Sequence, residues 1–227
     1  MAGTAAPHKE RADAVRNRER IVAAAREALV VHGPEAPLDE IARAAGVGNA
    51  TLYRHFPDRE ALLRAVVLAV TERITERAER ALEVLDEAGA PGAADGAAQA
   101  DDGVFAAVCG FVEGAVEERV GALCPVLSRR FDEDDPQFLG ARTRLEERVQ
   151  ELVQRAQDAG QLRPDIGVGD LMVALSQLAR PLPCTRSAEI GRFIDRHVRL
   201  YLDGLRAPAR SGLPGHAATL EDLRRDC

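Results

Sequence analysis

The 227-residue sequence has no apolar run that approaches the eighteen residues of a membrane-spanning helix. Its first 20 residues also lack the apolar centre of a signal peptide. A hydrophobic content of 46% and a charged content of 30% are ordinary for a globular chain. These features predict a soluble, cytoplasmic protein of one large or two modest domains, with no membrane partner.

The sequence also lacks the patterns that most often carry catalysis or metal binding. Its four cysteines show no C-x-x-C pair or metal-ligand spacing, its five histidines lack a serine or cysteine partner pattern, and no phosphate-binding glycine loop is present. We therefore expect no catalytic residue, no metal and no cofactor. Reduced cysteines are the favoured interpretation, and a thiol sensor is the alternative. These residues are Cys109, Cys124, Cys184 and Cys227, and His8, His32, His55, His197 and His216.

The sequence also has no excess of positive charge, and its net charge is −7. Nucleic-acid binding depends on where charge lies rather than on the total. Residues 1–60 hold nine Lys/Arg and nine Asp/Glu, whereas residues 61–227 hold 21 and 28 and carry the whole deficit. Within residues 1–26, six basic side chains outnumber three acidic ones, so this segment can reach phosphates.

The sequence does contain a pattern of two short helices joined by a tight turn, between residues 38 and 56. Apolar side chains recur at helical spacing in the first helix, and Leu52 and Phe56 do so in the second. The turn Gly46-Val47-Gly48 separates them, because glycine suits the left-handed end of a helix and Val47 can anchor the turn. The first set is Leu38, Ile41, Ala42 and Ala45. The pattern predicts a helix-turn-helix whose second helix suits the major groove of DNA.

Two flanking helices are expected to bury the apolar faces of this pair, which could not offset its own ordering entropy. Upstream, apolar residues repeat at helical spacing from Ile21 to Leu29, and Gly33-Pro34 closes the run. Downstream, Pro57-Asp58 supplies a break and an N-cap for a fourth helix, which we expect from about Asp58 to Leu85.

These segments together resemble the TetR family of regulators, over roughly residues 15 to 70. IARAAGV followed by TLYRHFP carries this resemblance, and RNRERIVAAARE, APLDEIARAAGVG, LYRHFPDREALL and GQLRPDIGVGDL are similar to its SbtR-like branch. The resemblance implies an all-α fold, with an N-terminal three-helix helix-turn-helix domain followed by an α-helical ligand-binding and dimerisation domain. We expect a flexible basic arm over residues 1–15, the DNA-binding domain over 16–60, the helical domain over 61–206 and a loose C-terminal tail over 207–227.

The resemblance also implies that Tyr53 and His55 contact the DNA backbone. Taken alone, Tyr53 could be a packing residue, and His55 could cap or pack beside Phe56. The N-terminal end of the same helix should come closest to base edges. The predicted DNA-binding residues are Asn49, Ala50, Thr51, Tyr53, Arg54, His55, Arg59 and Arg16. For Arg16, which could enter a minor groove, the alternative is a solvated charged helix face.

Three positions depart from the common family pattern. Gly48 stands where serine is frequent, Arg59 where lysine is frequent and Pro37 where threonine is frequent. Glycine can still cap a helix, and arginine keeps the positive charge while changing its donor geometry. Pro37 removes a hydroxyl and a backbone donor that could bind phosphate.

The remaining sequence predicts further helices after an exposed connection over residues 87–102. Their apolar stripes cover residues 105–116, 123–131, 135–160, 168–182 and 190–205. The last two stripes could be core, or could form a four-helix bundle with a symmetry mate. The resemblance favours a dimer interface of Leu171, Leu175, Leu178, Phe193, Ile194, Tyr201 and Leu202.

The resemblance further implies a small-molecule effector pocket in the C-terminal domain. The residues expected to line it, each of which could instead be plain core, are Phe105, Cys109, Val112, Phe138, Leu145 and Met172. The expected function is a nucleoid-associated, homodimeric repressor that binds a pseudo-palindromic double-stranded DNA operator and is released by the effector. The alternatives are a helical enzyme and a module whose acidic C-terminal body binds another protein. Salt-sensitive binding to promoter DNA separates these possibilities.

Overall fold

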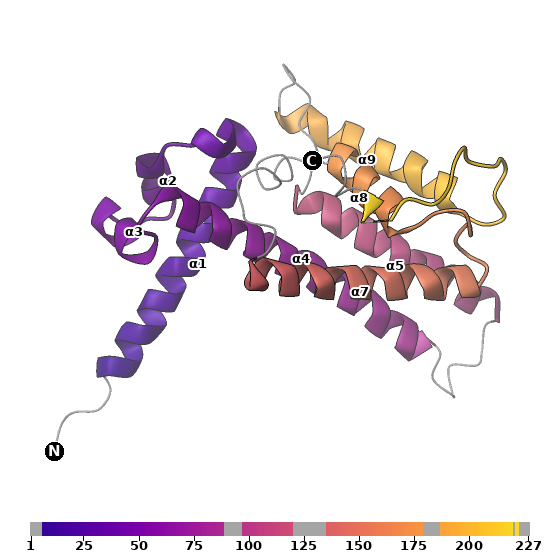
Figure 1. Ribbon diagram of the computed structural model, residues 1–227, viewed down its shortest axis with the longest axis horizontal. Helices are drawn as coiled ribbons and strands as arrows, with labels where there is room; N and C mark the ends of the chain where they lie inside the picture. Colours follow the sequence, from indigo (N-terminus) through magenta and orange to yellow (C-terminus); the bar gives the residue numbers. More distant parts are fainter. Residues whose placement is uncertain (1–5, 89–96, 120–134, 179–186, 220, 223–227) are drawn as a thin grey trace. The chain divides into compact units, whose positions relative to one another are not determined.

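The computed structural model of the chain describes residues 6–88, 97–119, 135–178, 187–219 and 221–222. Regular secondary structure in these residues is helical apart from one isolated bridge, which confirms the all-α fold class (Figure 1). The chain divides into two compact units, Met1–Ala69 and Val70–Cys227. None of the described helices combines the length and apolar content that crossing a bilayer requires.

The first unit packs short helices around a small apolar core. Its helices are α1 (Ala6–His32), the 3-10 helix η1 (Gly33–Glu35), α2 (Leu38–Ala44), α3 (Asn49–His55) and the beginning of α4 (Arg59–Ala88). Helix α1 packs on α2 and α3 and buries Ile21 and Leu29, which lie about two turns apart. Ile41, Leu52 and Phe56 are buried in the same unit. The apolar periodicity of the sequence therefore predicted this core correctly.

The turn between α2 and α3 is a Schellman-type helix ending. Gly46 has a φ of +65°, its N–H donates to the Arg43 carbonyl, and the Val47 N–H donates to the Ala42 carbonyl. These bonds satisfy carbonyls that the end of α2 would leave without partners. A Cβ at position 46 would lie 2.4 Å from Nη2 of Arg20. The backbone conformation therefore favours glycine here, and a larger residue would also have to displace the end of the Arg20 side chain.

Two helix boundaries differ from the expectation. Helix α1 begins at Ala6, so residues 6–15 are helical rather than a flexible arm. Helix α5 (Ala97–Glu117) begins inside the stretch that we expected to be a connection. Both extensions contain several alanines, the residue with the highest intrinsic helix propensity. The short helix expected over residues 123–131 lies outside the described residues.

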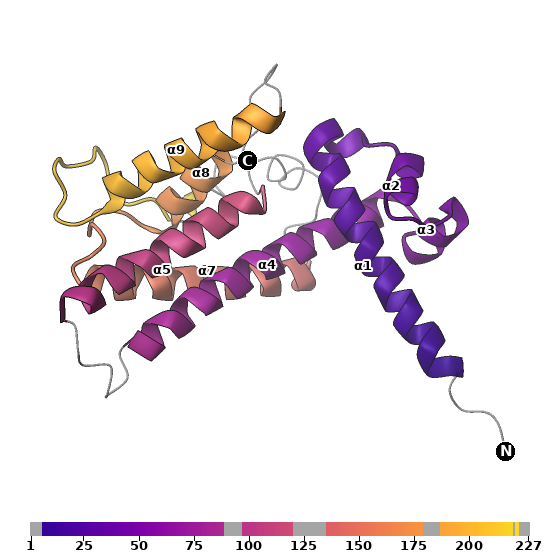
Figure 2. The same cartoon turned by 180° about the vertical axis from the view of Figure 1, so that it is seen from behind.

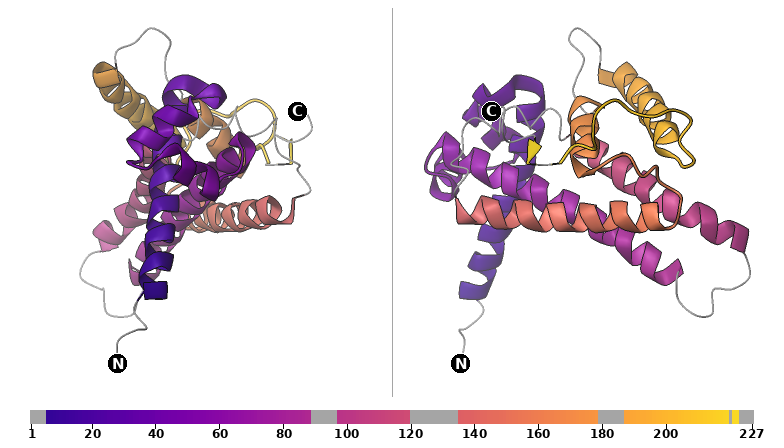
Figure 3. Two further views of the ribbon diagram at one scale, coloured as in Figure 1. Left: turned by 90° about the vertical axis from the view of Figure 1, so that its left-hand side faces the viewer. Right: turned by 45° about the vertical axis from the view of Figure 1, so that its right-hand side comes forward.

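The second unit is a helical bundle with α5 at its centre. Its other helices are the continuation of α4, α7 (Pro136–Asp158), α8 (Val168–Leu178) and α9 (Ser187–Leu205). Helix α5 contacts α7, α8 and α9, and lies between α7 and α9 (Figures 1 and 3). It buries Phe105, Phe111 and Val112 completely. Asp135 caps α7 by accepting a hydrogen bond from the Gln137 N–H at 2.9 Å, as its Asp-Pro start predicted.

A buried carboxylate joins α4 to the end of α5 in the second unit. Glu118, which is 6% exposed, accepts hydrogen bonds from Arg77 at 2.9 Å and from Arg73 at 3.3 Å. Arg77 also reaches the exposed Glu117 at 3.1 Å. A Cβ at Gly114 would lie 2.4 Å from the Arg77 guanidinium, so this glycine leaves room for the arginine to cross α5.

A second set of ion pairs joins α4 to α7. Glu72, Glu79 and Asp86 are spaced by seven residues and therefore share one side of α4. Arg144 of α7 lies 3.0 Å from Glu72 and 2.9 Å from Glu79, and Arg155 pairs with Asp86. These groups reach solvent, so we expect salt to screen them.

The segment after α9 differs from the loose tail expected over residues 207–227. Its residues 206–219, which we name the C-terminal strap, return from the end of α9 toward α8 (Figure 2). The Ala207 N–H donates to the Gln161 carbonyl at 3.0 Å, and the Gly169 N–H donates to the Ala218 carbonyl at 2.9 Å. Asp170 accepts from the Ala218 N–H at 3.0 Å. The local composition suggested a loose tail, because composition carries no information about such long-range hydrogen bonds.

Arg163, a buried residue in the turn between α7 and α8, holds the strap at its middle. Its guanidinium bonds the Asp165 carboxylate at 2.6 and 2.9 Å, the Gly204 carbonyl at 3.1 Å and the Ser211 carbonyl at 2.7 Å. These bonds hold the pKa of the Asp165 carboxyl at about 2. One side chain thus links the turn, the last turn of α9 and the strap.

Candidate nucleic-acid interface

The helix α3 presents its polar residues on the side away from the core of the first unit. Leu52 and Phe56 point inward and are buried. Tyr53 is 51% exposed. A large aromatic side chain that the unit leaves in solvent is available to another molecule. The structure thus favours the surface alternative for Tyr53 over the packing one.

His55 occupies an intermediate position at the end of α3. It is half-buried, and its ring centroid lies 6.4 Å from that of Phe56 at an angle of 46°. This ring contact matches the packing alternative, while the exposed part of the imidazole can still reach a phosphate oxygen. The phosphate contact of His55 stays a prediction.

The first turn of α3 carries the residues predicted to approach base edges. Asn49 and Ala50 are exposed, and Thr51 is half-buried. Gly48 is the N-cap residue, with an extended backbone and no side chain to cap the helix. Its carbonyl accepts the Thr51 and Leu52 N–H groups at 2.9 and 3.1 Å. Glycine therefore serves at the position where the family more often has serine.

Arg54 is exposed and bonds a neighbour on its own helix. Its Nη2 donates to Oγ1 of Thr51 at 3.1 Å, one turn earlier. The partner is a neutral hydroxyl, so the guanidinium keeps its full positive charge at the surface. Arg54 and Thr51, both predicted DNA-binding residues, are thus brought together as a pair.

Arg59 has an internal role that the sequence did not indicate. Its Nη1 donates to the carbonyls of Pro34 at 3.0 Å and Ala36 at 2.6 Å, which ties α4 to the segment between α1 and α2. Arg16, in contrast, is largely exposed and pairs with Asp13 on α1. A phosphate contact by Arg59 would have to compete with these two bonds. Both predicted contacts stay predictions.

Two arginines of α1 support the turn and α3, although we did not select them. The guanidinium carbon of Arg18 lies 4.6 Å from the ring centroid of Phe56, and Arg20 reaches the Gly46 carbonyl at 3.5 Å. Both contacts connect residues more than 25 positions apart. No local pattern marks such pairs, so only their basic character could have drawn attention to them.

In the second unit, the residues expected to line an effector pocket are mostly core. Phe105, Val112 and Leu145 are buried, whereas Cys109, Phe138 and Met172 are half-buried. Burial raises the pKa of the Cys109 thiol, and the nearby Glu113 raises it further. Arg206 covers one face of Phe105, with its guanidinium carbon 4.2 Å from the ring centroid. The pocket stays a prediction.

The expected dimer interface needs a correction. Leu171, Leu175 and Leu202 are at most 4% exposed, so they belong to the core of the second unit and cannot cover a partner. An apolar stripe marks the buried side of a helix, and here the chain itself buries it. Leu178, Ile194 and Tyr201 are half-buried, and Phe193 is exposed. The hydroxyl of Tyr201 is buried and has no hydrogen-bond partner among the residues that the structure describes, and burial raises the pKa of this phenol.

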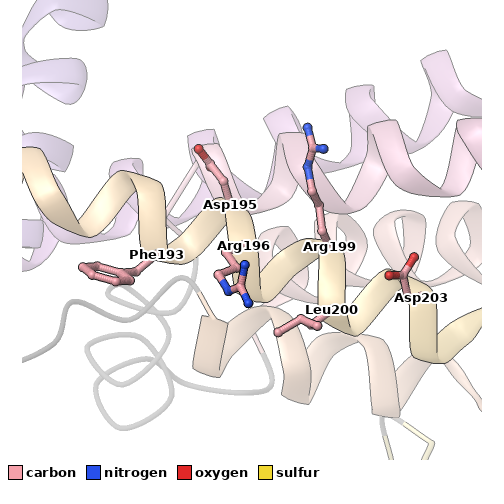
Figure 4. A pocket seen from close by; sticks show the side chains of 6 residues that line it. All are labelled: Phe193, Asp195, Arg196, Arg199, Leu200 and Asp203. Atoms are coloured by element: carbon pink, nitrogen blue, oxygen red, sulfur yellow. The ribbon is translucent and has the colours of Figure 1, made fainter.

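A shallow groove of about 550 Å³ lies on the outer side of α9 (Figure 4). It combines two apolar side chains with four charged ones: Phe193, Asp195, Arg196, Arg199, Leu200 and Asp203. Phe193 is 46% exposed and Leu200 is 58% exposed. Leu200 lies seven residues after Phe193, so a helical spacing of exposed apolar residues could have identified this surface from the sequence.

Two short helices joined by a tight turn, with a polar and solvent-exposed outer side on the second, define a DNA-binding transcription regulator of the helix-turn-helix class. Residues 21–66 match the family of bacterial regulatory proteins described as the tetR family, and residues 100–207 match the C-terminal domain described as transcriptional regulator SbtR-like. The chain belongs to the TetR family, with an SbtR-like C-terminal domain. Members of this family are transcription factors rather than enzymes.

Solved structures of the family resemble most of the chain. A TetR transcription regulatory protein from Mycobacterium vanbaalenii is 31% identical, with a TM-score of 0.58, over 87% of this chain and 99% of that one. A TetR regulator from Streptomyces coelicolor is 30% identical, with a TM-score of 0.54, over 85% and 99%. LfrR from Mycobacterium smegmatis, solved in complex with proflavine, is 25% identical, with a TM-score of 0.55, over 88% and 99%.

The sequence likeness to two curated relatives covers less than a third of the chain. The chain is 44% identical over 66 residues to the HTH-type transcriptional repressor LfrR, which is 29% of this chain and 34% of that repressor. A stretch of 60 residues is 45% identical to the HTH-type transcriptional regulator TtgW from Pseudomonas putida. The chain spans less than half the length of these curated relatives, 34% and 45% respectively.

Proposed function

We propose that this regulator is a homodimeric repressor that binds a pseudo-palindromic operator and leaves it when a small molecule binds the second unit. In this arrangement, two copies of α3 enter major grooves one helical turn apart, about 34 to 36 Å. The observation that carries the proposal is the outer side of α3, where Tyr53 and Arg54 are exposed on a helix anchored by Leu52 and Phe56. The description of LfrR as a repressor supports repression rather than activation.

The groove on α9 supports self-association. In a dimer with a two-fold axis, every contact between two different residues occurs twice, once in each direction across the interface. Arg196 and Asp203 are seven residues apart on the exposed side of α9, so an antiparallel partner helix can place each opposite the other. The exposed Phe193 and Leu200 would lose water in the same contact. This surface replaces the buried leucines as our proposed dimer interface.

A small-molecule effector is proposed from the relatives and from the continuity of α4. LfrR was solved with proflavine, which is a property of that protein. In this chain α4 begins at Arg59 in the first unit and ends at Ala88 in the second, without interruption. A ligand that displaces α4 in the second unit would therefore alter the spacing of the two α3 helices. A coupling free energy of about 1 to 3 kcal/mol is typical of such an effect.

DNA binding is tested by selecting duplexes from a random pool and measuring affinity against salt concentration. We expect a selected duplex to bind at least 1,000-fold more tightly than scrambled DNA, which is the ordinary specificity range for such regulators. Tyr53→Ala should weaken binding to both duplexes by about the same factor. Tyr53→Phe removes only the hydroxyl and so distinguishes its contribution to binding from that of the ring. Failure to enrich any duplex would contradict the proposal.

The dimer is tested by exchanging charges on α9. Arg196→Asp and Asp203→Arg should each weaken the dimer in sedimentation equilibrium, because each places like charges opposite one another. The double variant should restore it. Leu200→Glu should give monomers, and an unchanged dimer in this variant and in both single charge variants would exclude this surface.

The effector is tested through the reciprocity of coupling. A compound that weakens operator binding by a given factor must itself bind the DNA-bound protein more weakly by the same factor. Titrating the compound into free and DNA-bound protein measures both. A compound that releases DNA but binds free and DNA-bound protein equally well does not act through the proposed coupling.

A further inference from the structure

We infer that Arg54 reads a guanine in the major groove and that Thr51 holds its guanidinium ready to do so. This inference rests on the proposed operator binding and assigns the base contact to a particular side chain and a particular base. It differs from the general expectation for α3, in which Asn49, Ala50 and Thr51 approach the bases because they begin the helix.

Helical geometry places Arg54 at the middle of the exposed side of α3. Each residue turns the helix by about 100°. Leu52 and Phe56 are buried, so the direction midway between them points into the first unit. Arg54 lies about 180° from that direction, whereas Tyr53 and His55 lie about 100° to either side of Arg54. When α3 lies in a groove, the central side chain meets the base edges and the two flanking ones meet the walls.

The bond to Thr51 orders the side chain before DNA arrives. Arg54 is exposed, and long side chains on a helix point back toward its N-terminus. Nη2 of Arg54 is 3.1 Å from Oγ1 of Thr51, which places the guanidinium over the first turn of α3. Ala50, one turn before Arg54 and exposed beside it, has only a methyl group and leaves the groove floor open. Less side-chain entropy is then lost on binding.

The chemistry of the pair favours a base over a phosphate. Arginine can donate two parallel hydrogen bonds to O6 and N7 of guanine, the commonest specific contact in the major groove. Two other exposed arginines of this unit are paired with carboxylates, Arg43 with Asp39 and Arg16 with Asp13. Arg54 is held by a neutral hydroxyl, which can rotate and release it without separating opposite charges.

The experiment is a duplex selection with the wild-type protein, Arg54→Gln, Arg54→Lys and Thr51→Val. We expect the wild type to enrich one invariant guanine in each half-site and both Arg54 variants to lose it. On the selected duplex, exchanging that G·C pair should weaken wild-type binding about 5- to 150-fold and Arg54→Gln by less than about 2-fold. Thr51→Val keeps the side-chain shape and should lose part of the discrimination.

Base analogues separate guanine reading from other effects. Replacing the guanine by 7-deazaguanine removes N7 and should weaken the wild type but not Arg54→Gln. Inosine keeps O6 and N7 and should leave wild-type affinity unchanged. Because Arg54 is exposed, both variants should show the wild-type circular dichroism melting curve. Arg43→Gln, which removes an exposed arginine outside α3, is the matched control and should keep the guanine.

Three results would overturn the inference. The first is retention of the same guanine by Arg54→Gln, and the second is insensitivity of the wild type to 7-deazaguanine. The third is an equal loss by Arg54→Gln on every duplex, with the salt dependence reduced by about one phosphate contact, which identifies a backbone contact. If the wild type enriches no duplex, the proposed operator binding fails and the inference fails with it.

Discussion

Three arginines that hold elements of the first unit together contact neutral groups, whereas the arginines that join α4 to α5 and α7 in the second unit contact carboxylates. In the first unit, Arg20 and Arg59 donate to backbone carbonyls, and Arg18 lies over the ring of Phe56. In the second unit, the arginines that join helices contact carboxylates, as Arg144 does with Glu79. Bonds to neutral groups orient a guanidinium and leave its charge in place, whereas ion pairs cancel that charge.

The difference explains how an acidic chain can bind a polyanion. Residues 1–69 hold ten Lys/Arg and nine Asp/Glu, and residues 70–227 hold 20 and 28. The first unit therefore has almost no net charge, yet Arg18, Arg20, Arg54 and Arg59 contact neutral groups. Local pairing, more than the count of basic residues, decides whether a surface attracts phosphate.

The largest test of this comparison removes the buried carboxylate of the second unit. Glu118→Gln should lower the free energy of unfolding by about 3 kcal/mol, because Arg73 and Arg77 lose the charge that they surround. Glu117→Gln, at a position that is 71% exposed and contacts the same Arg77, is the control and should cost less than about 1 kcal/mol. Urea unfolding measures both, and equal losses would contradict the role of burial.

The next test concerns the turn that supports α3. Gly46→Ala should cost about 2 kcal/mol, because the residue needs a positive φ and its Cβ would collide with Arg20. Gly33→Ala shares a positive φ but meets open space, so its cost should be smaller. Thermal unfolding of the two variants separates backbone strain from the collision. A loss at position 46 that is no larger than the loss at position 33 would show that the Arg20 side chain moves aside at little cost.

A third test uses salt to distinguish the two kinds of arginine bond. Arg59→Met removes two charge-assisted bonds to carbonyls and should cost about 1.5 kcal/mol at any salt concentration. Arg144→Met should cost less than about 1 kcal/mol at low salt and almost nothing at 1 M NaCl. Urea unfolding at both salt concentrations measures these values. A loss of unfolding free energy in Arg59→Met that depends on salt would contradict the distinction between arginine bonds to carbonyls and arginine bonds to carboxylates.

The smallest effect is confined to acid pH. Asp165 has its pKa lowered from 3.8 to about 2 by its hydrogen bonds to Arg163. A carboxylate with a lowered pKa in the folded state stabilises the protein above its unfolded pKa, and this stability is lost as the pH falls through the folded value. The difference in unfolding free energy between wild type and Asp165→Asn should be constant above pH 5 and shrink between about pH 4 and pH 2. A difference that changes near neutrality would point to another group.

The sequence predicted the first unit more completely than the second, for a physical reason. Helical spacing identified Ile21, Leu52 and Phe56 as core, and Gly46 as the turn, because these features depend on neighbours in the chain. The same spacing could not decide whether Leu171 faces its own domain or a partner, since both environments are apolar. Burial in the structure answers that question for Leu171.

Contacts between distant residues were beyond the reach of the sequence. Nothing near Arg59 indicates that its guanidinium bonds the Ala36 carbonyl, and nothing in the Gly- and Pro-containing end indicates that Arg163 holds Ser211. Within α3, the sequence predicted which residues face DNA but not the hydrogen bond between Arg54 and Thr51. That bond depends on rotamers, which helical periodicity does not specify.

The glycine at position 169 has a consequence for reading other sequences of this kind. Even a methyl group there would lie 2.5 Å from the Ala218 carbonyl oxygen, so the last segment of the chain can pack on α8 only where that position stays bare. A related protein with alanine or serine at this position must route its final residues elsewhere. The lack of a side chain at position 169 thus predicts where a segment some fifty residues further along the chain can pack.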